Sequence, residues 1–298
     1  MRYGAVTAVD ELDLTVERGT ITAVLGPNGA GKTTTLETCE GYRRPMGGSV
    51  RVLGLDPVAD RRELLPRIGV MLQAGGAWAA VRPDEMLRHV AALHSSPLPV
   101  GMLMERLGLS EAARTPYRRL SGGMQQRLGL ALAIIGRPEL VFVDEPTAGM
   151  DPQARRDTWE LLEELRADGV TTVLTTHYLE EAERLADMVH VIDHGRLIAS
   201  GTPAGLTRGS SNRTIRLVLT TPYPTEAPDA LTRDLGDGAS VTRIDDQSLL
   251  ISGPADASTL AVVSAWCVRH GVVPDSLVMG QRTLEDVFLQ LTRTEPRE

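Results

Sequence analysis

The sequence predicts an α/β fold built on a parallel sheet, followed by a smaller α+β domain. Two observations carry this prediction. In the first two thirds of the chain, short apolar runs alternate with helical stretches, which is the pattern of a parallel sheet covered by helices. In the last third, the expected elements follow the order strand, helix, strand, strand, helix, strand. With 298 residues, the chain is long enough for one large domain and a smaller one.

Apolar runs mark the expected strands of the first domain. Residues 21–25, 140–143 and 173–174 are nearly continuous apolar runs, as buried parallel strands are. Residues 12–16 instead alternate apolar and polar side chains, which predicts a half-exposed strand.

A helix is expected between residues 152 and 169, because both of its ends carry clear signals. Asp151 can cap the first turn, Pro152 suits that turn because no N–H donor is needed there, and Gly169 suits the exit. Residues 84–135 are also mostly helical in pattern. We expect them to form an inserted helical subdomain.

Small polar residues at 207–212 separate the two expected domains, 1–207 and 213–298. The second domain is expected to contain strands at 215–219, near 241, near 250 and at 272–278, with helices at 227–235, 256–270 and 283–292. In chain order, the elements before the last helix follow the order strand, helix, strand, strand, helix, strand of a ferredoxin-like α+β domain.

Charge and hydropathy exclude several classes of protein. The net charge of -8 argues against general nucleic-acid binding, which needs a basic surface to displace the counterions of phosphates. The longest apolar run lies between Arg127 and Arg137 and is far shorter than the ~20 residues of a membrane-spanning helix. Cys39 and Cys267 cannot build a disulfide framework. We expect a cytosolic protein unless a partner holds it at a surface.

Residues 26–33, Gly-Pro-Asn-Gly-Ala-Gly-Lys-Thr, match the G-x-x-x-x-G-K-[ST] pattern of a phosphate-binding loop. An apolar strand precedes the loop and a helix-compatible segment follows it, as this motif requires. The glycines let backbone N–H groups surround a β-phosphate, and the helix presents its positive end to it. Lys32, the only lysine of the chain, would lie between the β- and γ-phosphates, and Thr33 would bind Mg²⁺.

Two carboxylates, Asp144 and Glu145, end the apolar run that starts at Leu140. Burying them unpaired would be costly, so they need a cation or a hydrogen-bond network. Asp144 would hold Mg²⁺ through water, as the equivalent acid of P-loop ATPases does. Glu145 would face the terminal phosphate and orient or deprotonate the attacking water.

Residues 120–125, Leu-Ser-Gly-Gly-Met-Gln, precede another helical stretch. Ser121, the N–H groups of Gly122 and Gly123 and the helix end would form a second anion cradle. Taken alone, Ser-Gly-Gly before a helix is a common cap. One nucleotide, however, rarely needs two such cradles from distant parts of one chain.

Together these motifs resemble the nucleotide-binding subunit of ATP-binding cassette (ABC) transporters. The motifs that carry the resemblance, in the order of that family, are residues 26–34, Gln73, residues 120–125, residues 140–146, residues 148–151 and His177. The resemblance runs from Tyr3 to about Pro203. It implies the P-loop NTPase fold of ABC ATPases, with ATP and Mg²⁺ as cofactors.

The resemblance also implies the roles of single residues. Gln73 would contact Mg²⁺ or the attacking water and relay to a membrane partner, while His177 would touch the γ-phosphate. Asp151 would lie at a dimer seam, and Tyr3 would stack on adenine. The expected catalytic residues are Glu145, His177 and Gln73, and the expected metal ligands are Thr33, Gln73 and Asp144. The nucleotide is expected to contact Tyr3, Gly26, Pro27, Asn28, Gly29, Ala30, Gly31, Lys32, Thr33, Thr34, Ser121, Gly122, Gly123 and Asp151.

Residues 283–289, Thr-Leu-Glu-Asp-Val-Phe-Leu, resemble the C-terminal segment of daunorubicin-type (ABC-2) multidrug exporter ATPases, whose membrane subunit is a separate polypeptide. The resemblance implies an ATPase that drives export of a hydrophobic drug-like solute or lipid. It would act as a homodimer sharing two ATP molecules, at the inner face of the cell membrane on its permease. No nucleic-acid partner is expected.

Three alternatives stay open. The chain could be a cassette ATPase that acts on ribosomes or DNA without transport. It could also be a small-molecule P-loop kinase, for which the Ser121 motif would be idle. Residues 213–298, expected to be an accessory domain, could be a regulatory binding module.

Two further groups of residues are interpreted as structural. Glu180, Glu181 and Glu183 are expected to form a solvated helix face near a helix N-terminus. His190 and His194 lie in a strand, turn and strand pattern, so they would not share a helical metal-binding face.

Overall fold

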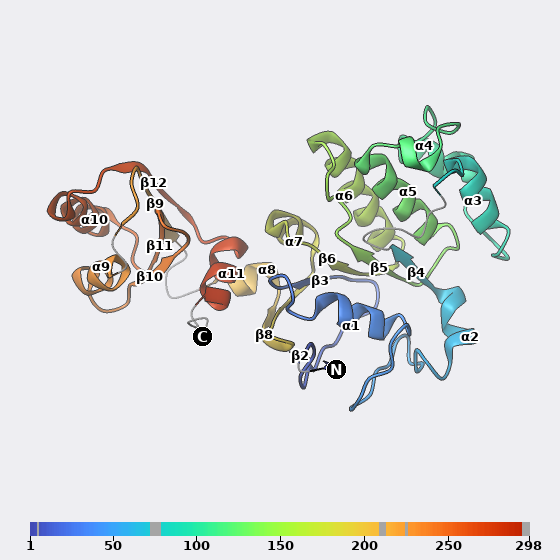
Figure 1. Cartoon of the computed structure of the whole chain (residues 1–298), viewed down its shortest axis with the longest axis horizontal. Coiled ribbons are helices and arrows are strands. Elements are labelled where there is room, and N and C mark those ends of the chain that lie inside the picture. The colour runs from blue at the N-terminus through green and yellow to red at the C-terminus, as the bar shows by residue number, and fades with distance from the viewer. Residues whose placement is uncertain (5, 72–78, 209–212, 224–225, 294–298) are drawn as a thin grey trace. The chain divides into compact units, whose positions relative to one another are not determined.

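The chain divides into two compact units, Met1–Gly201 and Thr202–Glu298 (Figure 1). The computed structural model describes the whole chain except residues 5, 72–78, 209–212, 224–225 and 294–298. The expected boundary at residue 207 differs slightly from this division, because a short helix, α8 (Pro203–Thr207), is grouped with the second unit.

A six-stranded sheet forms the centre of the first unit. Its strands, in spatial order, are β4 (Ile68–Met71), β5 (Leu140–Asp144), β6 (Thr171–Thr175), β3 (Ile21–Leu25), β7 (Met188–Asp193) and β8 (Arg196–Gly201). The first five are parallel, and β8 is antiparallel to β7. All residues of β3 and β6 are buried. The expected buried parallel strands are therefore confirmed.

The expected strand at residues 12–16 is wrong. The described N-terminal segment forms instead a small hairpin of β1 (Arg2–Tyr3) and β2 (Val6–Thr7), followed by extended chain without a strand partner. Leu12 and Val16 are half-buried and pack against the apolar core. Alternation of apolar and polar side chains indicates that a segment has one buried face. A segment can bury one face without pairing with a neighbouring strand.

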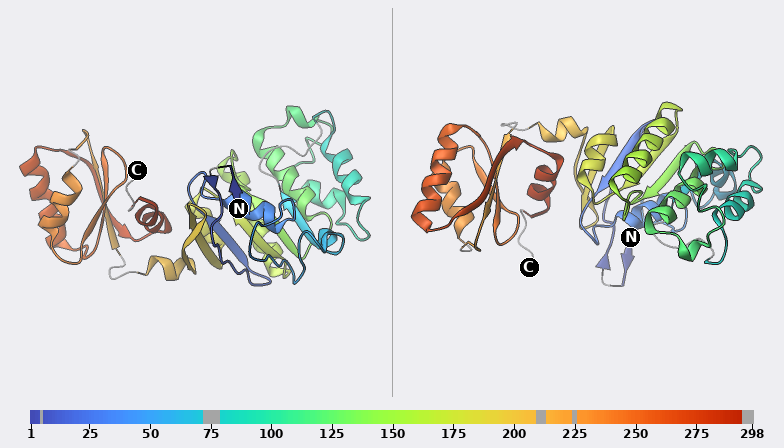
Figure 2. Two further views of the ribbon diagram at one scale, coloured as in Figure 1. Left: turned by 60° about the horizontal axis from the view of Figure 1, so that its bottom comes forward. Right: turned by 90° about the horizontal axis from the view of Figure 1, so that it is seen from above.

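Helices surround this sheet (Figure 2). In chain order they are α1 (Lys32–Cys39), α2 (Arg61–Leu64), α3 (Pro83–Ala91), α4 (Val100–Arg106), α5 (Gly122–Ile134), α6 (Pro152–Ala167) and α7 (Leu179–Leu185). Helix α5 packs on β4 and β5, and α3 packs on both α4 and α5. The segment expected to be a helical subdomain thus contains α3, α4 and α5.

Helix α6 begins and ends where its sequence signals predict. The Asp151 carboxylate accepts hydrogen bonds from the backbone N–H groups of Gln153 (3.0 Å) and Ala154 (2.9 Å). Gly169, at φ +82°, provides the left-handed conformation that ends the helix. Trp159 and Leu162 are buried on the same face.

The second unit is a four-stranded antiparallel sheet with helices. After α8 its elements are β9 (Arg213–Leu219), α9 (Ala227–Leu235), β10 (Ser240–Arg243), β11 (Ser248–Ser252), α10 (Ala257–His270), β12 (Pro274–Gln281) and α11 (Leu284–Arg293). The spatial order β10-β11-β9-β12, with every pair antiparallel, is that of a ferredoxin-like domain. Its core contains Trp266, Ile215 and Leu231.

Candidate functional site

Three neighbouring strands end at the same edge of the central sheet. Strands β5, β6 and β3 are adjacent and parallel, so the segments that follow them meet at that edge. The loop at 26–33 follows β3, Asp144 and Glu145 lie at the end of β5, and His177 follows β6. The topology therefore gathers motifs that lie far apart in the sequence.

Glycines of the 26–33 loop are required by the backbone. A side chain at Gly26 would place its Cβ 2.2 Å from the carbonyl oxygen of Ile192. Gly31 has φ +101°, and a Cβ there would lie 2.2 Å from the carbonyl oxygen of Ala8. Gly29, at φ +83°, faces open space. The loop thus takes a shape that L residues would strain, and it leaves its outer side free for a ligand.

Lys32, the first residue of α1, folds back over this loop. Its Nζ donates hydrogen bonds to the carbonyl oxygens of Gly26 (2.6 Å) and Pro27 (3.0 Å). Burial lowers the pKa of Lys32, and the nearby carboxylates of Glu145 and Asp144 act in the opposite direction. The ammonium group is therefore bonded to the loop and attracted electrostatically to the two acids.

The remaining loop residues differ in exposure. Ala30 is buried, and its N–H donates to the carbonyl oxygen of Pro27 (3.2 Å). Asn28 and Thr33 are exposed, and Thr34 is half-buried. The Thr33 hydroxyl is thus accessible at the start of α1.

Asp144 is a half-buried carboxylate at the end of β5. Burial raises its pKa, while the hydroxyl of Thr175, which donates to the carboxylate, and the charge of Lys32 lower it. Removing this carboxylate from water is unfavourable, and a cation beside it offsets that cost.

Glu145 and His177 lie in direct contact. The Nδ1 atom of His177 is 3.2 Å from Oε1 of Glu145. Glu145 has a φ of +50°, which is uncommon for a residue other than glycine, and its N–H donates to the carbonyl oxygen of Thr175 (3.0 Å). The backbone therefore holds this side chain in a conformation that must be stabilised by its surroundings.

Ser121 is the N-cap of helix α5. Its hydroxyl oxygen accepts a hydrogen bond from the N–H of Met124 (3.2 Å), and both Ser121 and Gly122 are exposed. Gly123 is buried, and a Cβ there would lie 3.4 Å from Cγ of Met150, next to Asp151. Within the described parts of the chain, no hydrogen bond or ion pair joins Ser121 to the loop of residues 26–33, called the Lys32 loop below.

Two further residues expected at the site, Tyr3 and Gln73, are not part of this described cluster. Gln73 lies outside the described residues. Tyr3 belongs to strand β1, is 41% exposed, and has the guanidinium carbon of Arg43 5.1 Å from its ring centroid. The Tyr3 side chain is therefore partly accessible to solvent.

Glu181 was expected on a solvated helix face, and that expectation is wrong. Its side chain is fully buried in α7, and its Oε1 accepts hydrogen bonds from Thr147 (3.0 Å) and the Trp159 indole (2.9 Å). The sequence holds a partial signal, because Glu181 lies one helical turn before the buried Leu185. Its two partners are distant in the sequence and could not be found from it.

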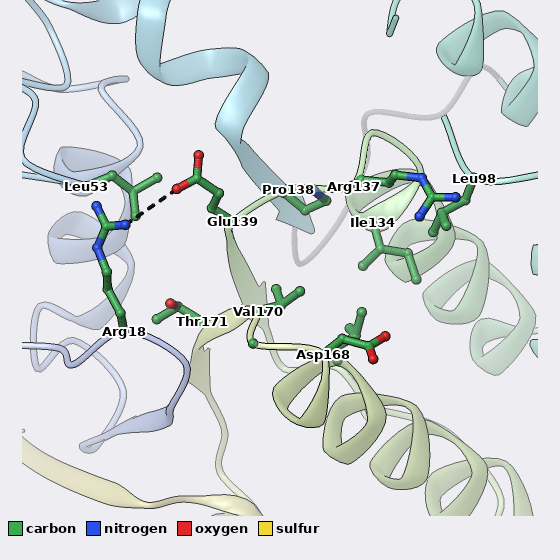
Figure 3. Close-up of a pocket in the computed structure, with 12 residues that line it drawn as sticks. Arg18, Leu53, Leu98, Ile134, Arg137, Pro138, Glu139, Asp168, Val170 and Thr171 are labelled. Atoms are coloured by element: carbon green, nitrogen blue, oxygen red, sulfur yellow. Dashed lines mark ion pairs between the residues drawn. The ribbon is translucent and has the colours of Figure 1, made fainter. Parts of the chain in front are cut away.

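A separate cavity of about 580 Å³ lies at the opposite end of the same strands, where β5 and β6 begin (Figure 3). Arg18 and Glu139 line it and form an ion pair of 3.6 Å. Its lining does not include Lys32, Asp144, Glu145, Ser121 or His177.

Known proteins resemble this chain over nearly its whole length. Residues 9–148 match the family model described as "ABC transporter". The daunorubicin resistance ATP-binding protein DrrA3 of Streptomyces coeruleorubidus is 36% identical over 99% of this chain and 94% of its own length. The Nod factor export ATP-binding protein I of Cupriavidus pinatubonensis is 39% identical over 100% of this chain and 90% of its own length.

Solved structures resemble about two thirds of this chain. An ATP-binding subunit of an ABC transporter has a TM-score of 0.63 at 28% identity, over 69% of this chain and 88% of its own. A dimeric ATP-binding cassette bound to ADP and phosphate has a TM-score of 0.62 at 22% identity, over 70% and 95% of the two chains, and supports the fold. Among the described residues, no helix has both the length and the apolar character to cross a membrane.

Proposed function

The chain belongs to the ABC transporter family, as an ATP-binding subunit of the exporter type, and from this membership we propose that it hydrolyses ATP to drive export through a separate membrane permease. The relatives named for daunorubicin resistance and Nod factor export support this direction of transport. The proposed cargo is a hydrophobic drug-like solute or lipid. The proposed location is the inner face of the cell membrane, where the permease would hold the subunit.

The phosphates of ATP would bind at the 26–33 loop. The Lys32 ammonium now bonds carbonyl oxygens of that loop, and it would exchange them for phosphate oxygens. Thr33 and Asp144 would hold Mg²⁺, because a hydroxyl and a carboxylate are oxygen ligands of the kind this ion prefers. When bound, Mg²⁺ would neutralise negative charge on the phosphates.

Glu145 would orient or deprotonate the attacking water. The observation that carries this role is its 3.2 Å contact with His177, at the sheet edge that also holds Lys32. His177 would keep the Glu145 carboxylate directed at the terminal phosphate and contact that phosphate itself. The tilted ring contact of His177 with Tyr178 (centroids 4.0 Å apart) supports a fixed orientation of the imidazole.

The Ser121 cradle would bind the ATP of a second copy. Ser121 and Gly122 are exposed at the positive end of α5, a place that favours an anion. Two copies related by a two-fold axis would then share two ATP molecules. Loss of the γ-phosphate would remove the group that joins the copies.

The test of this function is Glu145→Gln, which removes the base but keeps the shape of the side chain. Hydrolysis should fall at least about 10²-fold while ATP binding is kept, and an ATP-bound dimer should accumulate. Light scattering with ATP measures the dimer, and phosphate release measures hydrolysis. Glu160→Gln, on the exposed face of α6, is the matched control and should behave as the parent. Normal hydrolysis by Glu145→Gln would rule out Glu145 as the base.

A further inference from the structure

A buried carboxylate in α7 has no role in the function proposed above. Glu181 has no exposed surface, and its Oε1 atom accepts hydrogen bonds from Thr147 (3.0 Å) and from the Trp159 indole (2.9 Å). Among the described residues, its Oε2 atom has no hydrogen-bond partner. Burial raises the pKa of Glu181, and hydrogen bonds with Thr176, Trp159 and Thr147 act in the opposite direction.

Glu181 joins three segments that form the edge of the site. Thr147 lies two residues after Glu145, in the turn that follows β5. Trp159 belongs to α6, whose first turn is capped by Asp151. Glu181 itself lies four residues after His177, in the segment that follows β6. One carboxylate oxygen therefore bonds the turn of Glu145 and helix α6 to the segment of His177.

Glu181 bonds the turn after β5, whose first residue, Glu145, has a strained backbone conformation. Glu145 has a φ of +50°, and two backbone hydrogen bonds close the turn, from Ala148 N–H to Glu145 (3.2 Å) and from Met150 N–H to Thr147 (3.2 Å). A left-handed conformation at a non-glycine residue persists only when its surroundings fix it. The buried Thr147 hydroxyl, anchored on Glu181, supplies a fixed point outside the turn.

A second contact links the same segments. The guanidinium of Arg155, on α6, lies 4.4 Å from the ring centroid of Tyr178, the neighbour of His177. This cation–π contact holds α6 against the His177 segment from another side. Two independent contacts thus keep α6 and the His177 segment together.

We propose that Glu181 is a positioning residue, which anchors the Thr147 turn so that Glu145 stays in contact with His177 during turnover. This inference rests on the proposed function. Glu181 touches neither substrate nor metal and acts through Thr147. Its loss should lower the rate of hydrolysis more than the affinity for ATP, since the Lys32 loop does not depend on it.

The test replaces Thr147 by valine, which keeps the volume and removes the hydroxyl that Glu181 accepts from. ATP affinity should stay within about 2-fold while kcat falls by about tenfold or more. Thr147→Ser, which restores the donor, should recover most of kcat. Thr172→Val is the matched control, because Thr172 is buried in β6 and its hydroxyl has no hydrogen-bond partner among the described residues. The kcat of this variant should equal that of the parent.

A double variant separates positioning from general destabilisation. If Thr147 acts through Glu145, adding Thr147→Val to Glu145→Gln should lower single-turnover hydrolysis by less than about 2-fold. The proposal would be overturned if Thr147→Val lowered single-turnover hydrolysis tenfold in the Glu145→Gln variant as well. An unchanged kcat in the single variant Thr147→Val would also overturn it. Loss of hydrolysis in Glu145→Gln with normal kcat in Thr147→Val would refute positioning only. Normal hydrolysis in Glu145→Gln would refute the proposed function itself.

Discussion

Glu40 ends helix α1 as a buried carboxyl group close to the site. It is 5% exposed, and burial, with smaller contributions from the charges of Glu37 and Asp144, raises its pKa to about 7. Its ionised form is therefore unfavourable in the folded protein. An unfolded chain ionises this group near its ordinary pKa of 4.5. The stability of the nucleotide-free protein should then fall as pH rises from about 4.5 to about 7 and stay lower above that range.

Glu40→Gln tests this effect, because glutamine keeps the shape and cannot ionise. The free energy of unfolding should be higher for the variant than for the parent at pH 8. This difference between variant and parent should be larger at pH 8 than at pH 5 by about 2 kcal/mol. Denaturant unfolding at the two pH values measures the difference. A gain that is equal at both values would show that Glu40 does not titrate between them.

Single residues of the candidate site could be proposed from the sequence only where the signal is local. Lys32 and Thr33 belong to one short motif, and Asp144 and Glu145 end one apolar run. Glu181 was misplaced because its partners lie 34 and 22 residues away in the sequence. A charged residue on a short helix resembles a solvated one until its neighbours are known.

At the scale of elements, the final helix is fixed by the motif that resembled exporter ATPases. The N–H of Thr283 donates to the Asp286 carboxylate (3.0 Å), and the N–H of Asp286 donates to the Thr283 hydroxyl oxygen (3.2 Å), which is a reciprocal cap of α11. Asp286 also accepts a hydrogen bond from Thr214 of β9 (2.9 Å) and pairs with Arg216 (3.4 Å). The motif therefore caps a helix and docks it on the sheet.

Asp286→Ala should release α11, because it removes the cap and leaves the buried Thr214 hydroxyl without its acceptor. We expect a loss of about 2 kcal/mol of local stability and faster hydrogen exchange in residues 284–293. Glu285→Ala is the control, since the Glu285 side chain is half-exposed and, among the described residues, makes a surface ion pair with Arg216 (3.3 Å). Equal exchange in the two variants would contradict this account of the motif.

Elements were predicted well where length and end signals agree. The helix expected at 227–235 has those bounds in the structure, and α6 starts at its predicted cap. The segment at 12–16 failed because strand pairing is a property of two segments, and alternation reports only one. Pairing partners could not be derived from local pattern alone.

At the scale of the whole molecule, the order of strands explains how one site is built from distant motifs. The fold class was predictable because alternating strands and helices permit few arrangements, and parallel strands bring their ends to one edge. The Ser121 cradle, in contrast, has no bond to the Lys32 loop among the described residues. A second copy of the chain is the proposed source of the missing contact.

The dependence of ATPase activity on protein concentration tests this central claim most directly. If two copies share each ATP, the rate per molecule should rise with concentration and level off once sedimentation shows a dimer with ATP. Ser121→Arg should keep ATP binding at the Lys32 loop and lose that rise. A constant rate per molecule, at concentrations where sedimentation shows only single copies, would contradict the account.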